Sequence, residues 1–193
     1  LVRLRREFAT GLTLLELIGG DEPPGAAELD GIATRAPRRL TEAPKMVDLT
    51  GLADIAGSDP EPEYVSINGL GETVVTLQEN NHLVVVSKEG ELLNHFSAGS
   101  VDLDGIDATD ERGALIFTES QQGRLREPDA VTWIDDEHFA IANEGDYNGG
   151  SRGWSIFNKD GTLVYDSGVD FEHAIIQIGH YPDKRSDAKG VEP

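Results

Sequence analysis

The stretch that decides the fold is EPDAVTW at residues 127–133, which is followed by HFAIANEGD at residues 138–146. An earlier part of the chain has the same pattern, with EPEYVSI at residues 61–67 and VVTLQENN at residues 74–81. Three of the chain's four Glu-Pro pairs begin at residues 61, 127 and 192 and are therefore 66 and 65 residues apart, while the fourth begins at residue 22. A nearly constant period of this kind indicates an internal structural repeat.

Each repeat shows short runs in which apolar and polar residues alternate, which is the pattern of half-buried β-strands. The predicted strands are residues 64–67, 72–77, 82–86 and 92–96 in the first repeat, and 130–134, 138–142, 154–157 and 163–165 in the second. Lys88-Glu89-Gly90 and Lys159-Asp160-Gly161 precede the last strand of each repeat, where a tight hairpin turn needs a residue with positive φ. Each repeat is therefore predicted to be a four-stranded antiparallel meander.

Four strands in about 40 residues are typical of a β-propeller blade. The predicted fold class is all-β, a propeller fragment with an irregular connecting segment at residues 1–59 and a partial propeller at residues 60–193. The blades are expected at about 60–99 and 127–168, with another starting near residue 190, and residues 99–126 and 169–190 form long excursions between them. An antiparallel sandwich is the alternative, but it does not explain the recurring Glu-Pro pairs.

Two blades cannot close a ring, so we expect the remaining blades to come from the same longer chain or from another subunit. The chain begins on Leu1 rather than Met and stops on a Glu-Pro pair, so both ends are expected to be cuts within a longer polypeptide.

In the connecting segment, residues 12–18 are apolar enough for a strand or a helical turn. Residues 19–25 are predicted to be a loop, and residues 50–57 a short helix capped by Thr50.

The composition argues against nucleic-acid binding, cysteine-based sites and a membrane-spanning segment. With 38% hydrophobic and 27% charged residues the chain is globular, and its formal net charge of −20 argues against binding nucleic acid through a basic surface. There is no cysteine for a disulfide or a thiolate zinc site. No apolar run approaches the roughly 18 residues that would span a membrane.

Several phrases together resemble a known family. They are EPEY at 61–64, TLQENN at 76–81, EPDA at 127–130, ANEGD at 142–146, GSRG at 150–153, EH at 172–173, GHYP at 179–182 and KGVEP at 189–193. The set is similar to the secreted bacterial β-propeller proteins called alkaline-phosphatase-like or phytase-like, with esterase-like activity, the choice-of-anchor I group. The resemblance covers residues 60–193 and implies a ring of about seven blades, a periplasmic or extracellular location and phosphoesterase activity.

The phrase at residues 143–146 is the first candidate site, because it places an amide and the carboxylates of Glu144 and Asp146 directly after a strand. Hard oxygen ligands of this kind suit Ca²⁺ or Mg²⁺, and Glu79 is expected at the same rim of the first blade. A metal held there would bind a phosphate and activate a water molecule, while Arg152 would clamp a phosphate oxygen. The alternative is that Glu144 and Asp146 cap backbone N–H groups in a tight turn.

Residues 102–110 form the second candidate cation site, an acidic stretch in which Asp102, Asp104 and Asp107 flank a glycine. The stretch resembles part of a calcium loop but lacks the downstream glutamate of an EF-hand. A solvated acidic loop is the alternative interpretation.

Other residues give weaker indications. His82, His95 and His138 are expected on or beside strands. His173 and His180 are expected in the second excursion, where a ligand or general-acid role is the alternative to a structural one. Trp133 and Trp154 are expected to pack between neighbouring blades rather than to bind carbohydrate. No nucleophile elbow surrounds Ser151.

Two functions compete on these grounds. The first is a metal-dependent phosphoric ester hydrolase, with Ca²⁺ as cofactor and a phosphorylated small molecule as substrate. The second is a non-catalytic propeller that acts as a binding or scaffold subunit, since the fold hosts many proteins that are not enzymes.

Overall fold

The computed structural model describes residues 2–6, 13–17, 45–109, 115–144, 151–185 and 190–191. The chain divides into two compact units, Leu1–Leu49 and Thr50–Pro193. The first unit contains a three-stranded antiparallel sheet of order β2-β1-β3, made of β1 (Val2–Arg6), β2 (Thr13–Leu17) and β3 (Lys45–Val47). Residues 12–18 therefore contain a strand and not a helical turn, while residues 19–25 lie outside the described residues.

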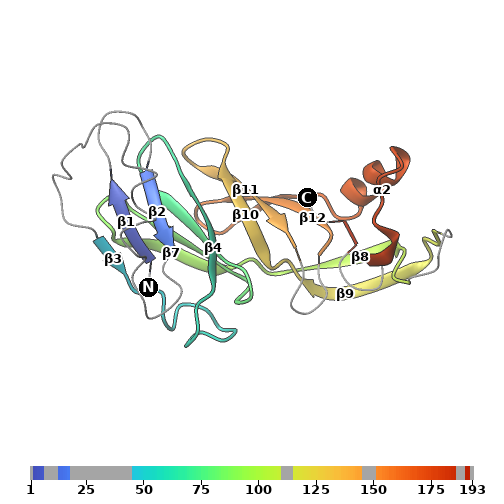
Figure 1. Ribbon diagram of the computed structural model, residues 1–193, viewed down its shortest axis with the longest axis horizontal. Coiled ribbons are helices and arrows are strands. Elements are labelled where there is room, and N and C mark those ends of the chain that lie inside the picture. Colours follow the sequence, from blue (N-terminus) through green and yellow to red (C-terminus); the bar gives the residue numbers. More distant parts are fainter. Residues whose placement is uncertain are drawn as a thin grey trace, which may run out of the picture. The chain divides into compact units, whose positions relative to one another are not determined.

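The second unit contains two four-stranded antiparallel sheets in simple meander order (Figure 1). The first sheet consists of β4 (Pro62–Ile67), β5 (Thr73–Leu77), β6 (His82–Val86) and β7 (Leu92–Ser97). The second consists of β10 (Pro128–Trp133), β11 (His138–Asn143), β12 (Gly153–Asn158) and β13 (Leu163–Asp166). All eight predicted strands are confirmed, and the chain is an all-β, propeller-like fragment.

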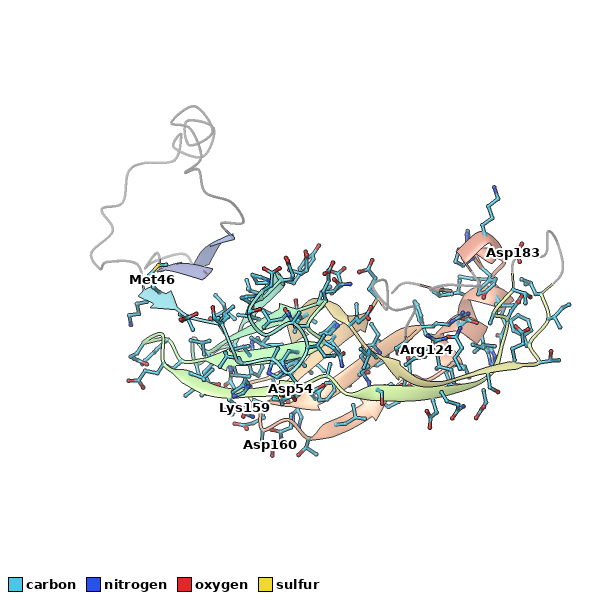
Figure 2. The ribbon with its side chains drawn as sticks, turned by 90° about the horizontal axis from the view of Figure 1, so that it is seen from below. Met46, Asp54, Arg124, Lys159, Asp160 and Asp183 are labelled. Carbon is cyan, nitrogen blue, oxygen red and sulfur yellow. The ribbon has the colours of Figure 1, made fainter. Side chains whose placement is uncertain are left out.

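The two glycine turns are also confirmed as equivalent hairpins. Gly90 has a φ of 83° and Gly161 a φ of 95°, a region that residues with a Cβ rarely adopt. Each glycine N–H donates to a carbonyl three residues earlier at 2.9 Å, that of Ser87 in the first sheet and that of Asn158 in the second. Figure 2 shows Lys159 and Asp160 projecting from the second of these turns.

The two sheets pack face to face around one hydrophobic core. Apart from Ala98, which follows β7, its buried members come from alternate positions of both sheets, as the side-chain period of two requires: Val74, Leu83, Val85, Phe139, Ile141 and Phe157. Trp133 packs on this cluster with its ring centroid 5.2 Å from that of Phe139, and its Nε1–H donates to the carbonyl of Ser66 at 3.0 Å. The prediction that Trp133 packs between blades is therefore confirmed.

Both long excursions contain regular structure. The first forms a two-stranded hairpin of β8 (Ser100–Ile106) and β9 (Glu119–Leu125), and the second contains α2 (Asp170–Gln177) and the 3₁₀ turn η1 (Asp183–Arg185). Helix α2 lies beside the β8–β9 hairpin (Figure 1), where His173 Nε2 is 3.3 Å from the carbonyl oxygen of Gly105.

The helix predicted for residues 50–57 is wrong, because these residues form a series of turns. The Asn80 side chain donates to the carbonyls of Ile55 at 3.0 Å and Asp59 at 3.1 Å, and within the loop the N–H of Gly51 donates to the carbonyl of Gly57 at 2.6 Å, which is not a helical hydrogen bond. Ala56 has a φ of 47°, which a right-handed helix excludes. Long-range hydrogen bonds have overridden a weak local helix signal.

Candidate functional site

The candidate site lies at the rim where β5 and β11 end. In the first repeat the N–H of Gln78 donates to the carbonyl of Glu61 at 3.1 Å, and in the second the N–H of Glu144 donates to that of Glu127 at 3.2 Å. Glu144 is therefore equivalent to Gln78. Glu79, expected at the same rim, follows Gln78 directly and acts with Glu144 on the carboxyl of Glu63, and its side chain is exposed to solvent.

These two equivalent residues contact each other across the sheets. The Nε2 of Gln78 donates to an Oε2 of Glu144 at 2.8 Å, so one carboxylate oxygen of Glu144 already has a partner. Four elements of the two repeats meet at this point, because Leu77 pairs with Pro62 and Asn143 pairs with Pro128. The rim is thus built by the Glu-Pro openings and the ends of the second strands.

The rim also gathers negative charge. Burial raises the pKa of Glu63 above its ordinary value, and the neighbouring carboxylates of Asp129, Glu61, Glu144 and Glu79 raise it further. Glu63 and Asp129 each follow the proline of a Glu-Pro pair, so the repeat itself carries the signal for these two acids, which the sequence analysis missed. Crowded carboxylates attract cations, because a positive charge relieves their mutual repulsion.

No three His, Asp or Glu side chains come together as a ready metal site in the part of the chain that the structure describes. Asp146, one of the predicted ligands and catalytic residues, lies outside that part. The described rim residues therefore form a negatively charged surface rather than a preformed coordination shell.

Arg152, predicted to clamp a phosphate, has a fully buried side chain. Its Nη1 donates to the carbonyl of Asp107 at 2.8 Å and lies 3.3 Å from Oε2 of Glu172, which is also fully buried. The hydroxyl of Tyr181 is 3.4 Å from the same nitrogen. Arg152 thus joins the start of β12 to α2 and to the end of β8, and a phosphate would have to displace Glu172 to reach it in this arrangement.

Glu172 and Tyr181 were not identified as partners of Arg152 from the sequence. Each belongs to a phrase that contributes to the family resemblance, and Gly190 of a third such phrase packs on both charged side chains, leaving no room for a Cβ. Burial raises the pKa of Glu172, while Arg152 acts in the opposite direction. Phrases that are far apart in the sequence therefore meet at one buried ion pair.

The acidic stretch at residues 102–110 is not one loop, which corrects the second expectation. Asp102 and Asp104 lie on the exposed side of β8, where an Oδ1 of Asp102 accepts the N–H of Gly123 at 2.7 Å. Asp107 is buried and accepts the N–H groups of Thr109 at 3.1 Å and Ile116 at 3.2 Å. Asp102 and Asp104 therefore share one exposed side of a strand, whereas Asp107 is buried after its end, and Asp110 lies outside the described residues.

A cavity of about 210 Å³ opens beside the end of the first sheet. It is lined by Asp54, Ile55, Asn80, Asn81, His82, Ser97, Gly99, Ser100 and Leu125. The lining contains no Arg or Lys, and burial together with the neighbouring His95 lowers the pKa of His82 to about 4, so this histidine is neutral at pH 7. The cavity therefore lacks the positive charge that would bind a phosphate.

His82 gives the protein a pH-dependent stability. Its Nε2 is 3.0 Å from Nδ1 of His95, and only 4% of its surface is exposed. Because its pKa is about 4 in the folded state and about 6.5 in the unfolded state, the unfolded state binds more protons between these values. We expect the free energy of unfolding to fall as the pH drops from 6.5 to 4, by up to about 3 kcal/mol.

Urea unfolding at a series of pH values measures this effect, with His82→Asn compared with the native chain. The variant is expected to lose most of the slope between pH 6.5 and 4. His180→Gln, which changes an exposed histidine, serves as the control and is expected to keep it. An unchanged slope in His82→Asn would show that His82 does not titrate in this way.

Two equivalent four-stranded sheets with an acidic rim define a propeller-type β protein. The chain belongs to the family described as Choice-of-anchor I domain, whose sequence pattern matches residues 42–149 and 147–193. Membership in this family indicates an exported or cell-surface protein. No curated protein matches the chain. In the described residues no helix is long and apolar enough to cross a membrane.

Proposed function

We propose that this chain is a segment of an exported propeller-type protein whose repeats form a binding or scaffold surface without catalysing a reaction. The observation that carries the proposal is the complete burial of Arg152 against Glu172. The residue expected to hold a phosphate instead holds α2 against the sheet. Further blades, in the same polypeptide or in another subunit, complete the ring.

Three other residues of the expected site support the same proposal. Glu144 is bonded to Gln78, Asp107 is turned into its own hairpin, and Asp102 lies on the exposed side of β8. An active site needs such groups to converge on one reacting atom. Each of them is positioned instead by a structural partner of its own.

A phytase-like, metal-dependent phosphoesterase is the second candidate, because acidic side chains gather at the rim, where burial and then the neighbouring carboxylates raise the pKa of Glu63. In this candidate Glu144, with Asp146 and Glu79, holds a Ca²⁺ ion that activates a water molecule to attack a phosphorylated small molecule. A divalent cation at the rim would relieve the repulsion among Glu63, Asp129 and Glu144.

The two functions are separated by assaying the full-length protein on p-nitrophenyl phosphate and p-nitrophenyl acetate, with Ca²⁺ and with a chelator. We expect no calcium-dependent turnover of either compound. Calcium-dependent turnover that disappears in Glu144→Gln would overturn the scaffold proposal and establish the phosphoesterase.

Thermal melts in Ca²⁺ and in chelator locate any cation site independently of turnover. Two double variants are compared, and each removes two negative charges. The rim variant carries Glu63→Gln and Glu144→Gln, and the β8 variant carries Asp102→Asn and Asp104→Asn. If the rim holds a cation, only the rim variant loses the increase of the melting temperature in Ca²⁺. A loss confined to the β8 variant would place the ion on β8.

A further inference from the structure

The cavity beside the end of the first sheet has no role in the function proposed above. Its volume of about 210 Å³ has room for several water molecules, so a ligand with a handful of non-hydrogen atoms fits into it. Asp54, which is labelled in Figure 2, reaches this cavity from the loop that precedes β4. The polar groups that the fold leaves available in the lining decide which ligand the cavity can bind.

Several polar side chains of the lining already have partners. Asn80 donates to the loop carbonyls described above and accepts a backbone N–H at 2.8 Å. Asn81 accepts the N–H of Glu127 at 2.9 Å and donates to the carbonyl of Gly99 at 3.0 Å. The hydroxyl of Ser97 donates to the carbonyl of Asn81 at 3.3 Å. These groups hold the surrounding backbone in place and are not available to a ligand.

Three other polar groups of the lining remain available. The carboxylate of Asp54, Nδ1 of His82 and the hydroxyl of Ser100 make no hydrogen bond or ion pair with another residue in the part of the chain that the structure describes. Each of these groups can accept a hydrogen bond, and Asp54 adds a negative charge. The lining contains no Lys or Arg, so the available groups suit a ligand that carries N–H donors and a positive charge.

The other nitrogen of His82 is engaged with His95. Nε2 of His82 is 3.0 Å from Nδ1 of His95, and the ring centroids are 5.3 Å apart, which is 2.3 Å more. Because this difference is about twice the distance from the centre of an imidazole ring to one of its atoms, both nitrogens lie on the line that joins the rings. They form a straight N–H···N hydrogen bond and do not converge on a third point, as two ligands of a metal ion would. When His82 donates this bond, its Nδ1 is an acceptor.

We propose that this cavity binds a small primary alkylammonium ion, which donates to the carboxylate of Asp54 and to Nδ1 of His82, with the hydroxyl of Ser100 as a third acceptor. An ammonium group has three N–H donors and no acceptor, so it matches these groups in number and in charge. Ile55 and Leu125 are the apolar part of the lining and cover a short alkyl chain. The site shares no residue with the acidic rim and does not depend on the scaffold function.

The electrostatics of the cavity favour the same ligand. Burial and the neighbouring His95 lower the pKa of His82 to about 4, so the imidazole does not repel a cation at pH 7. Asp54 acts on His82 in the opposite direction, which shows that the carboxylate and the ring influence each other across the cavity. An anionic ligand would meet the Asp54 carboxylate without a compensating cation in the lining.

NMR titration of the isotope-labelled full-length protein with n-butylammonium chloride, at pH 7 and constant ionic strength, tests the proposal. The signals of the His82 ring and of the Ser100 amide are expected to shift and to saturate. Neither n-butanol, which has the chain without the charge, nor tetramethylammonium, which has the charge without N–H donors, is expected to produce saturable shifts. Saturation by tetramethylammonium, or no saturation by n-butylammonium, would overturn the proposal.

Two variants in one loop separate the site from the general attraction of an acidic protein for cations. Asp54→Asn is expected to weaken binding of n-butylammonium by about tenfold or more, because it removes a charge-assisted hydrogen bond. Asp59→Asn removes the same charge from an exposed residue outside the lining, and is expected to weaken binding by less than about twofold. Equal weakening in the two variants would contradict binding at the cavity.

The tautomer of His82 provides a measurement that needs no variant. Nitrogen NMR spectra of the unmutated protein saturated with n-butylammonium are expected to show His82 protonated on Nε2 and unprotonated on Nδ1, because Nδ1 must accept from the ligand. His82 protonated on Nδ1 in this complex would overturn the proposed contacts.

Discussion

Replacing Arg152 with methionine is expected to lower the free energy of unfolding by about 3–5 kcal/mol, because the substitution leaves Glu172 as a buried charge without its cation. Methionine keeps much of the length and apolar stem of arginine, so the loss reports mainly on the ion pair and on the hydrogen bond to the Asp107 carbonyl. Urea unfolding at pH 7, followed by circular dichroism, measures the difference. Amide hydrogen exchange is expected to show faster exchange in α2.

Lys159→Met is the matched control, because it also removes a cation from carboxylate partners, here Glu72 and Glu137. Lys159 contacts Glu72 at 3.2 Å and Glu137 at 3.1 Å, but all three side chains are partly exposed, and such pairs contribute about 0–1 kcal/mol. Adding Glu172→Gln to Arg152→Met should recover part of the loss, since it removes the buried unpaired charge. If Arg152→Met costs no more than Lys159→Met, Arg152 and Glu172 do not form a buried pair in solution.

Phe139→Ala is expected to cost about 3–5 kcal/mol, the usual range for deleting a buried phenylalanine. Phe139 is fully buried, and its ring centroid lies 5.2 Å from that of Trp133 and 6.3 Å from that of Phe157. The cavity would open between the two sheets, so both should unfold together at a lower denaturant concentration.

Ile134→Ala provides the comparison for this core position, because Ile134 directly follows β10 and is 55% exposed. A surface truncation of this kind is expected to change the free energy of unfolding by no more than about 0.5 kcal/mol. Two separate unfolding transitions in Phe139→Ala, with one sheet unaffected, would show that the sheets do not share a core.

The strands were predictable because their signal is local and repeated. Alternation with a period of two, and a glycine at each final hairpin, occur in both repeats, so Gly90 and Gly161 each supported the assignment of the other. The observed β6 has the predicted bounds, His82–Val86, and the other strands differ from prediction by at most two residues at either end.

Long-range contacts account for what the sequence analysis missed. The helix expected at residues 50–57 is replaced by turns that Asn80 holds from more than twenty residues away. The acidic stretch that begins at Asp102 looks like a loop in the sequence because its partner strand β9, with the sequence ESQQGRL, has no apolar alternation of its own. In both cases pairing with a distant segment decides the local structure.

The candidate site was only partly predictable for the same reason. The repeat locates the rim, but the equivalence of Gln78 and Glu144 becomes visible only through their hydrogen bonds to Glu61 and Glu127. The burial of Arg152 depends on Glu172 of α2, whose position above β12 no periodicity in the sequence indicates.

Nuclear Overhauser effects between aromatic ring protons and methyl groups test most directly the packing of the two repeats against each other. Effects are expected between the ring of Phe139 and the methyl groups of Leu83 and Val85, which share the core between the sheets. Val84 alternates with these residues on β6 and should show none. Effects from Phe139 to Val84, with none to Leu83 and Val85, would mean that the first sheet presents its other face and would contradict the repeat packing.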